Sequence, residues 1–376
     1  MKKSRGTSDL HRNRPPSTEG KFDLKPSKES NSRLGEVIAG LFPGYFALVM
    51  ATGIVSISAH LLGMRAVAWP LVFANIAAYL VLVTLLLIRI VRFFPRVLSD
   101  LGDHVLGPGF FTVVAGTCVL GSQLVIVAGQ FEVAAVLWFV GLGLWVVIMY
   151  AFFTAITIKE IKPALVKGIN GAWLIAAVAT QSVSVLGTLL AEHFAGYREP
   201  LLFFTLCMFL VGCMLYLLLI TLIFYRFTFL DLTTASLTPP YWINMGAVAI
   251  TTLAGARLIL AAGDLRFLAE ILPFLKGFTL FFWASGSWWI PLLLILGAWR
   301  HIYKKFPLRY DPQYWGMVFP FGMYTTCTFQ LSKAISFEPL MIIPQIFIYL
   351  AIAAWIAASA GMLYSFVPTR AGEPGN

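Results

Sequence analysis

Charged side chains are scarce in this chain of 376 residues, since Asp, Glu, Lys and Arg make up 12% of it while hydrophobic residues make up 59%. A soluble domain carries about 25% charged residues, so the composition excludes an ordinary soluble protein. Runs of roughly 20 apolar residues, each long enough to cross a bilayer, follow one another along the chain. These runs are continuous and do not alternate, which predicts an all-α polytopic membrane protein and not a β-barrel.

The residues of common catalytic and metal sites are also few. The four cysteines lie inside apolar runs and form no CxxC pair, so we expect neither a disulfide framework nor a metal site; they are Cys118, Cys207, Cys213 and Cys327. The five histidines are scattered, and no HExxH, Walker, GxSxG or dinucleotide-binding motif is present. We therefore expect no enzyme, no cofactor and no metal. A receptor or scaffold would need long loops or an extramembrane domain, and the connections here are short.

Apolar runs are missing from the two ends of the chain. Residues 1–35 are polar and rich in Ser, Pro, Lys and Arg, which predicts a disordered tail and not a cleaved signal peptide. Because this tail adjoins a spanning helix, we expect it to set orientation and contact anionic lipid, and we expect no nucleic-acid partner. Residues 365–376 are predicted to form a second, short tail.

Between the tails, residues 36–364 are predicted to form one membrane domain of ten spanning helices. The expected spans are 36–63, 67–91, 106–129, 132–157, 168–191, 200–225, 240–262, 268–298, 314–334 and 339–364. An even number of spans places both termini on one side. Of the 27 lysines and arginines, 21 lie in the tails and connections of that side. The positive-inside rule then predicts a multi-pass protein of the cell membrane with both termini in the cytoplasm.

Odd and even spans differ in composition. The second span lacks glycine, whereas the odd spans carry Gly, Pro, Ser and Thr and share a start with an aromatic residue in the first turn. These starts read PGYFALVMATG, GPGFFTVVAGT, NGAWLIAAVAT, PPYWINMGAVA and PQYWGMVFPFG, and they recur every 62 to 73 residues. The repeat predicts five helical hairpins, with the five odd-numbered helices as an inner ring around a pore. Small residues also allow helices to pack closely, which is the alternative explanation of the pattern.

One position of this shared frame stands out. The residues five places after the frame's first member are Met50, Ala115, Ala177, Gly246 and Phe319. If they meet at one depth, Phe319 is the rigid plug of an otherwise open ring. Pro320 is expected to break the helix there, and Gly316 and Gly322 to let it flex. The alternative is that Phe319 is an ordinary packing residue.

The stretches FPGYFALVMATGIVS in the first span and YWGMVFPFGMYTTCTF in the ninth resemble the tellurite-resistance/dicarboxylate transporter family, over about residues 36–364. That family includes fungal malate and sulfite transporters and plant guard-cell slow anion channels. The resemblance implies a five-helix pore, often in a trimer, that passes small anions such as C4-dicarboxylates and is occluded by a ninth-helix phenylalanine matching Phe319. The alternative substrates are inorganic anions such as sulfite, chloride, nitrate and tellurite-related oxyanions.

An anion path needs a favourable electrostatic potential but no site that binds the anion tightly, because the anion must also leave. The spans hold almost no acidic residues, and Arg257, Arg198 and Lys333 lie toward their outer ends, where they are expected to form an electropositive vestibule. Snorkelling of long side chains to the interface is the alternative.

Hydroxyls in the odd spans are candidate donors to a passing anion. The predicted pore-lining hydroxyl residues are Thr52, Thr117, Thr180, Thr251 and Thr325. The alternative is that each one bonds the carbonyl four residues earlier in its own helix.

Overall fold

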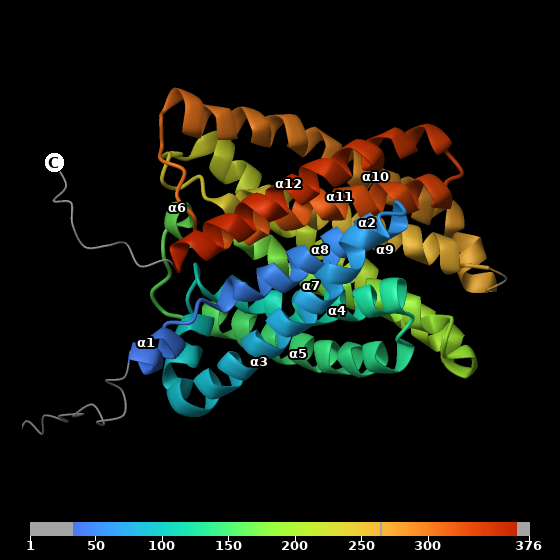
Figure 1. The fold of residues 1–376 in the computed structure, drawn as a ribbon, viewed down its shortest axis with the longest axis horizontal. Helices are drawn as coiled ribbons and strands as arrows, with labels where there is room; N and C mark the ends of the chain where they lie inside the picture. The colour runs from blue at the N-terminus through green and yellow to red at the C-terminus, as the bar shows by residue number, and fades with distance from the viewer. Residues whose placement is uncertain (1–32, 264, 367–376) are drawn as a thin grey trace, which may run out of the picture. The chain divides into compact units, whose positions relative to one another are not determined.

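The computed structural model describes residues 33–263 and 265–366, and within them it contains helices and no strand (Figure 1). The predicted all-α class is confirmed. The α-helices are α1 (Arg33–Ala39), α2 (Ala47–Leu61), α3 (Arg65–Leu101), α4 (Phe111–Ala128), α5 (Phe131–Ile158), α6 (Leu165–Gly168), α7 (Ile175–Ala191), α8 (Arg198–Phe229), α9 (Ile243–Ala261), α10 (Arg266–Ala298), α11 (Trp315–Ala334) and α12 (Ile342–Ser365).

Most predicted spans coincide with long helices to within a few residues, but the first begins later than expected and the second continues to Leu101, past a non-helical residue at Phe93. Residues 33–39 form a separate short helix, α1, before the 3₁₀ turn that leads into α2. The predicted N-terminal tail therefore includes three helical residues, and the predicted C-terminal tail includes Ser365, the last residue of α12, and Phe366. Residues 1–32 and 367–376 lie outside the described residues. Among the described residues, nine helices are long and apolar enough to cross a membrane, and the protein is a multi-pass membrane protein. The tenth long helix, α11, is less apolar.

Short helical turns precede the helices that carry the shared aromatic frame. They are η2 (Pro43–Phe46), η3 (Gly107–Phe110), η4 (Gly171–Leu174), η6 (Pro239–Trp242) and η8 (Pro312–Tyr314). Four of them have proline in their first turn. There the N–H that proline lacks would have no intrahelical partner, and its fixed φ is already helical. In η4 the side chain of Asn170 instead accepts a hydrogen bond from the Ala172 amide at 2.8 Å.

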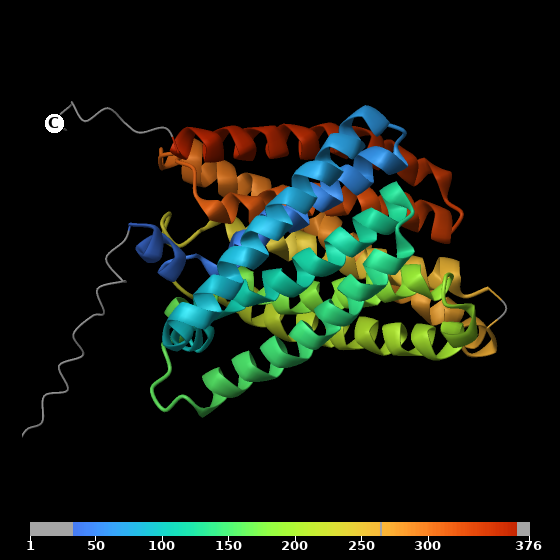
Figure 2. The same cartoon turned by 60° about the horizontal axis from the view of Figure 1, so that its bottom comes forward.

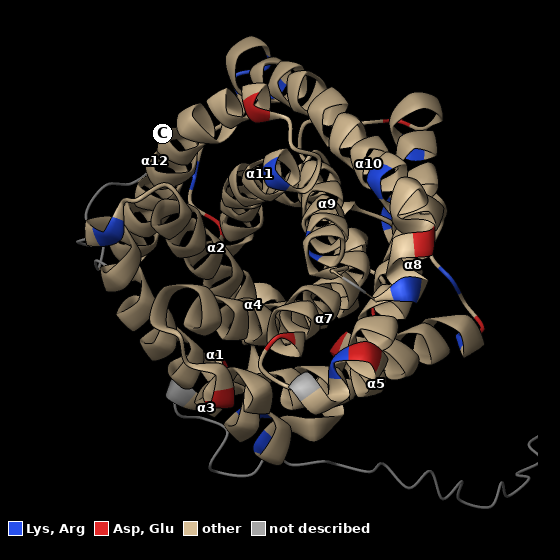
Figure 3. Cartoon of the chain, turned by 90° about the vertical axis from the view of Figure 1, so that its right-hand side faces the viewer, with Lys and Arg blue, Asp and Glu red and all other residues tan. Residues whose placement is uncertain are grey.

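The five helices that follow these turns pack against one another in a closed circuit. Each contacts the next, and α11 returns to α2 (Figure 3). We refer to α2, α4, α7, α9 and α11 as the central helices, and Figure 2 shows the helices lengthwise. The preceding turns contact one another in the same cyclic order, so the central helices begin at one common end. We call this the N-terminal end of the circuit.

The remaining long helices, α3, α5, α8, α10 and α12, are peripheral, and each packs on the central helix before it (Figure 3). The most apolar windows of the central helices that qualify as spans are 78–100% buried, against 22–44% for the peripheral ones. Because the central helices touch protein on all sides, they need small residues and tolerate hydroxyls, which explains the difference in composition.

Candidate functional site

Two cavities lie inside the circuit of central helices. Every central helix or its preceding turn contributes to both, and no peripheral helix contributes to either. The N-terminal cavity has a volume of about 40 Å³, and its lining includes Met50, Ile175, Ile243, Gly316 and Phe319. The C-terminal cavity has a volume of about 20 Å³, and its lining includes Ser122, Ser182, Arg257, Thr326 and Gln330.

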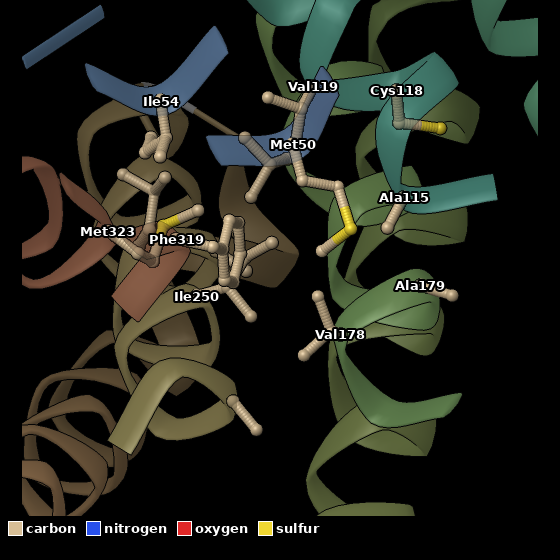
Figure 4. Packing of buried hydrophobic residues seen from close by; sticks show 14 of the residues in the cluster. Met50, Ile54, Ala115, Cys118, Val119, Val178, Ala179, Ile250, Phe319 and Met323 are labelled. Carbon is tan, nitrogen blue, oxygen red and sulfur yellow. The ribbon is translucent and has the colours of Figure 1, made fainter. Parts of the chain in front are cut away.

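Phe319 lies at the boundary between these cavities. It lines the N-terminal cavity, whereas Met323, one turn further along the same face of α11, lines the C-terminal cavity. The Phe319 side chain is 1% exposed. Figure 4 shows its ring directed to the central space that Met50 and Val178 also face, beside Ile250. The side chains at this depth are apolar, so the two cavities are separated by an apolar constriction.

Gly246 allows α9 and α11 to approach each other closely at this constriction. A Cβ atom on Gly246 would lie 2.8 Å from Cγ of Pro320 and 3.4 Å from Cδ1 of Phe319. Cβ atoms essentially never lie as close to another atom as 2.8 Å, so a larger residue than glycine at this position would displace Pro320 or the neighbouring Phe319 ring. Gly246 therefore lies close to Pro320 and Phe319.

In α7 the residue at this depth differs from the expected one. Val178 points into the central space in Figure 4, and the lining of the cavities continues the same face with Ile175 and Ser182. The predicted Ala177 is fully buried and lines neither cavity. An alignment of helix starts fixes depth but not rotation, and one residue turns a helix by about 100°.

The expected break at Pro320 is wrong. α11 is a continuous helix from Trp315 to Ala334 with Pro320 inside it. Pro320 has no N–H to donate to the carbonyl four residues earlier, and its ring crowds that carbonyl, which belongs to Gly316. Gly322 is also a packing residue here, because its Cβ would lie 2.8 Å from Cγ2 of Ile54 and its carbonyl accepts a hydrogen bond from Ser58 at 2.9 Å.

Three of the predicted lining threonines point to peripheral helices instead. Thr52 and Thr180 accept hydrogen bonds from the indole Nε1 groups of Trp355 and Trp145, at 3.0 and 2.8 Å. The hydroxyl of Thr117 lies 3.0 Å from that of Tyr79. These bonds join central to peripheral helices and satisfy polar groups that lipid cannot satisfy. The interpretation of these threonines as pore-lining is corrected accordingly.

Thr117 and Thr180 also donate to carbonyls four residues earlier, those of Val113 and Ala176, and the other two predicted threonines make the same kind of bond. Thr251 and Thr325 donate to the carbonyls of Ala247 and Phe321, four residues earlier, and line neither cavity. The hydroxyl groups that do line the C-terminal cavity belong to Ser122, Ser182 and Thr326. Helical spacing from Met323 and Phe319 would have indicated Thr326.

Of the three predicted vestibule cations, only Arg257 lines a cavity. Its Nε is buried and has no hydrogen-bond partner among the described residues, and no carboxylate lines the C-terminal cavity. Arg198 instead donates from Nη2 to the carbonyl of Ala261 at 2.7 Å, at the end of α9. The ammonium of Lys333 lies 4.3 Å from the ring centroid of Phe329. Arg257 is thus a cation directed to the space inside the circuit.

Possible metal ligands and cysteines are dispersed among the described residues. The described part of the chain holds no group of three His, Cys, Asp or Glu residues that could bind a metal ion, and its four cysteines are free. The ion pairs are peripheral: Arg89 with Asp100, His193 with Glu132, and Arg266 with Glu270.

Comparison with known proteins agrees with this geometry. The family described as voltage-dependent anion channel matches residues 41–363. An uncharacterized transporter of Methanocaldococcus jannaschii is 26% identical over 310 residues, which cover 81% of this chain and 87% of that protein. An uncharacterized membrane protein of Mycobacterium tuberculosis is 36% identical over 149 residues, which cover 40% of this chain and 75% of that protein.

Proposed function

Since the chain belongs to the voltage-dependent anion channel family and is a membrane anion channel or transporter, we propose that small anions cross it inside the circuit of central helices. Each of the five hairpins then contributes its central helix to an inner ring around a pore, and its peripheral helix faces lipid. The observation that carries the proposal is the pair of cavities lined by all five central helices and separated at Phe319.

Phe319 is proposed as the gate. Its ring is buried at the constriction, between Met50 and Ile250, and a narrow apolar passage opposes the entry of water and of hydrated ions. Met50 lines the N-terminal cavity beside it, and Val178 points into the same space in place of Ala177. Ala115 and Gly246 line neither cavity and are proposed as the small residues at this depth. Displacement of the ring would join the two cavities into one path, with α11 unbroken at Pro320.

Arg257 is proposed to attract the anion. The guanidinium of Arg257, whose buried Nε has no hydrogen-bond partner among the described residues, places a positive charge beside the C-terminal cavity, although the carboxylate of Glu192 acts on it from outside the lining. The hydroxyl and amide groups of Ser122, Ser182, Thr326 and Gln330 are weak donors there. Such neutral groups and one cation favour entry without a tight site.

Two substrate classes are candidates. C4-dicarboxylates such as malate are proposed from the resemblance to malate transporters. Inorganic monoanions such as chloride or nitrate are favoured by a specific observation, since Arg257 is the one cation among the residues that line the C-terminal cavity. A dicarboxylate would place its second charge beside neutral groups.

Orientation and assembly are also proposals. The connections rich in Lys and Arg precede the turns at the N-terminal end of the circuit, so we place that end and both termini in the cytoplasm and the protein in the cell membrane. A homotrimer with one path per subunit is proposed from the family resemblance, and light scattering of the purified protein tests it.

The function is tested by reconstitution into liposomes. Radiotracer uptake of malate, sulfite, chloride and nitrate is compared with and without a pH gradient. Uptake of any of these anions above protein-free liposomes supports the proposal, and dependence on the gradient distinguishes proton coupling from passive flow. Absence of uptake for all four anions, in both wild-type protein and Phe319→Ala, would reject it.

A further inference from the structure

A third cavity lies outside the circuit, near its N-terminal end. Its volume is about 230 Å³, and it is lined by η6, by the end of α10 and by the start of α11. It shares no lining residue with the two cavities inside the circuit. We call it the α10–α11 cavity, and nothing in the proposed anion path uses it.

The polar side of this cavity carries Arg300 and His301. Both belong to a π-helical turn at the end of α10, Trp299–Tyr303, and single π turns are frequent at functional sites. The Arg300 Nε is buried and has no partner among the described residues. No Asp or Glu lines the cavity, so its cation is not neutralised there.

The chain that follows the π-helical turn holds the side chains of Arg300 and His301 in place. Lys305 has a φ of 52°, a left-handed conformation, and the chain folds back so that the ring centroid of Phe306 lies 4.3 Å from the Arg300 guanidinium carbon. The Nδ1 of His301 lies 2.9 Å from the Phe306 carbonyl oxygen. Because a carbonyl only accepts, Nδ1 donates, and Nε2 is left for another partner.

Much of the remaining lining is apolar. Leu293, Leu296 and Met317 line it, and Leu308, which also lines it, is 74% exposed. A cavity lined by a cation that no carboxylate in the lining neutralises and by aliphatic side chains fits an amphipathic anion. A free phosphate would leave the aliphatic side chains uncovered.

We propose that the α10–α11 cavity binds an anionic phospholipid, with its phosphate at Arg300 and an acyl chain along Leu293 and Leu296. Basic pockets between spanning helices at the cytoplasmic side are suited to such headgroups. The lipid would contact Tyr314 and Met317 at the start of α11, and Phe319 follows two residues after Met317. Occupancy of the cavity would therefore bias the helix that carries the proposed gate.

Binding is tested without reference to transport. Thermal stabilisation of the detergent-purified protein is titrated with phosphatidylglycerol, phosphatidylcholine or inorganic phosphate. We expect stabilisation by phosphatidylglycerol alone, and an affinity about fivefold lower in Arg300→Gln, the effect of one basic residue near an anionic lipid. Arg309→Gln is the matched control, because Arg309 lies on the same connection but does not line the cavity.

A second variant fills the cavity and keeps its charge. A Cβ on Gly297 meets no atom within 4 Å, so Gly297→Leu extends into open space and should fold. It is expected to weaken phosphatidylglycerol binding as Arg300→Gln does. Equal affinity for phosphatidylglycerol and phosphatidylcholine, equal stabilisation by inorganic phosphate, or unchanged affinity in Gly297→Leu would overturn the proposal, whatever the flux assays show.

Discussion

Replacement of Phe319 by alanine removes the ring that separates the two cavities. For an anion to pass, this ring must leave a site in which it is 1% exposed. Burial of one phenylalanine side chain is worth about 1.5–3 kcal/mol, and each 1.36 kcal/mol changes a rate about tenfold. If the displacement is the main barrier, Phe319→Ala raises anion flux about 10- to 100-fold.

The assay is anion-dependent current or tracer flux in liposomes of known protein content. Phe321→Ala is the matched control, because Phe321 lies on the same helix but packs on Trp242, with ring centroids 5.1 Å apart. Size-exclusion elution shows whether each variant is folded. Flux in a monodisperse Phe319→Ala protein no higher than in wild type and Phe321→Ala would refute the gate.

Three further predictions concern charge, packing and pH. Arg257→Gln should lower anion flux about fivefold at about 0.01 M ionic strength and much less at about 1 M, where the Debye length is near 3 Å; equal losses would exclude an electrostatic role. Gly255→Val should lower thermal stability by about 1–3 kcal/mol, because its Cβ would lie 2.1 Å from Thr279 Oγ1, while Gly277→Val, with open space at its Cβ, should cost less. Burial and the nearby Lys159 and Lys162 lower the pKa of His104, despite the opposing charge of Asp103. The unfolded chain therefore binds the proton first, and stability should fall as pH drops below about 6.5. Melting temperatures at pH 7.5 and 5.5 should show a smaller difference in His104→Gln than in wild type.

The positions of the spanning helices could be predicted because length and apolar content decide them. The differing composition of odd and even spans was informative for a physical reason: helices surrounded by protein need small residues, and helices facing lipid need large apolar ones. The depth of Phe319 was predictable as well, since the turns that begin the central helices lie together at one end.

The rotation of the central helices could not be predicted in the same way. A helix buried on all sides has no exposed polar face, so the sequence of α7 did not distinguish Ala177 from Val178. For the same reason the hydroxyls of Thr52 and Thr180 were assigned to the path, although tryptophans of peripheral helices bind them. Spacing along α9 would have helped, because Ile243, Ile250 and Arg257 lie seven residues apart on one face.

The central claim is that Phe319 separates two aqueous compartments, and thiol accessibility measures this directly. In a variant without the four native cysteines, Gly316→Cys reports on the N-terminal cavity and Thr326→Cys on the C-terminal cavity. With Phe319 present, we predict that a charged, membrane-impermeant thiol reagent labels each position from one side of the liposome only, and that Phe319→Ala allows labelling from both sides. Labelling of either position from both sides while Phe319 is in place would contradict the account.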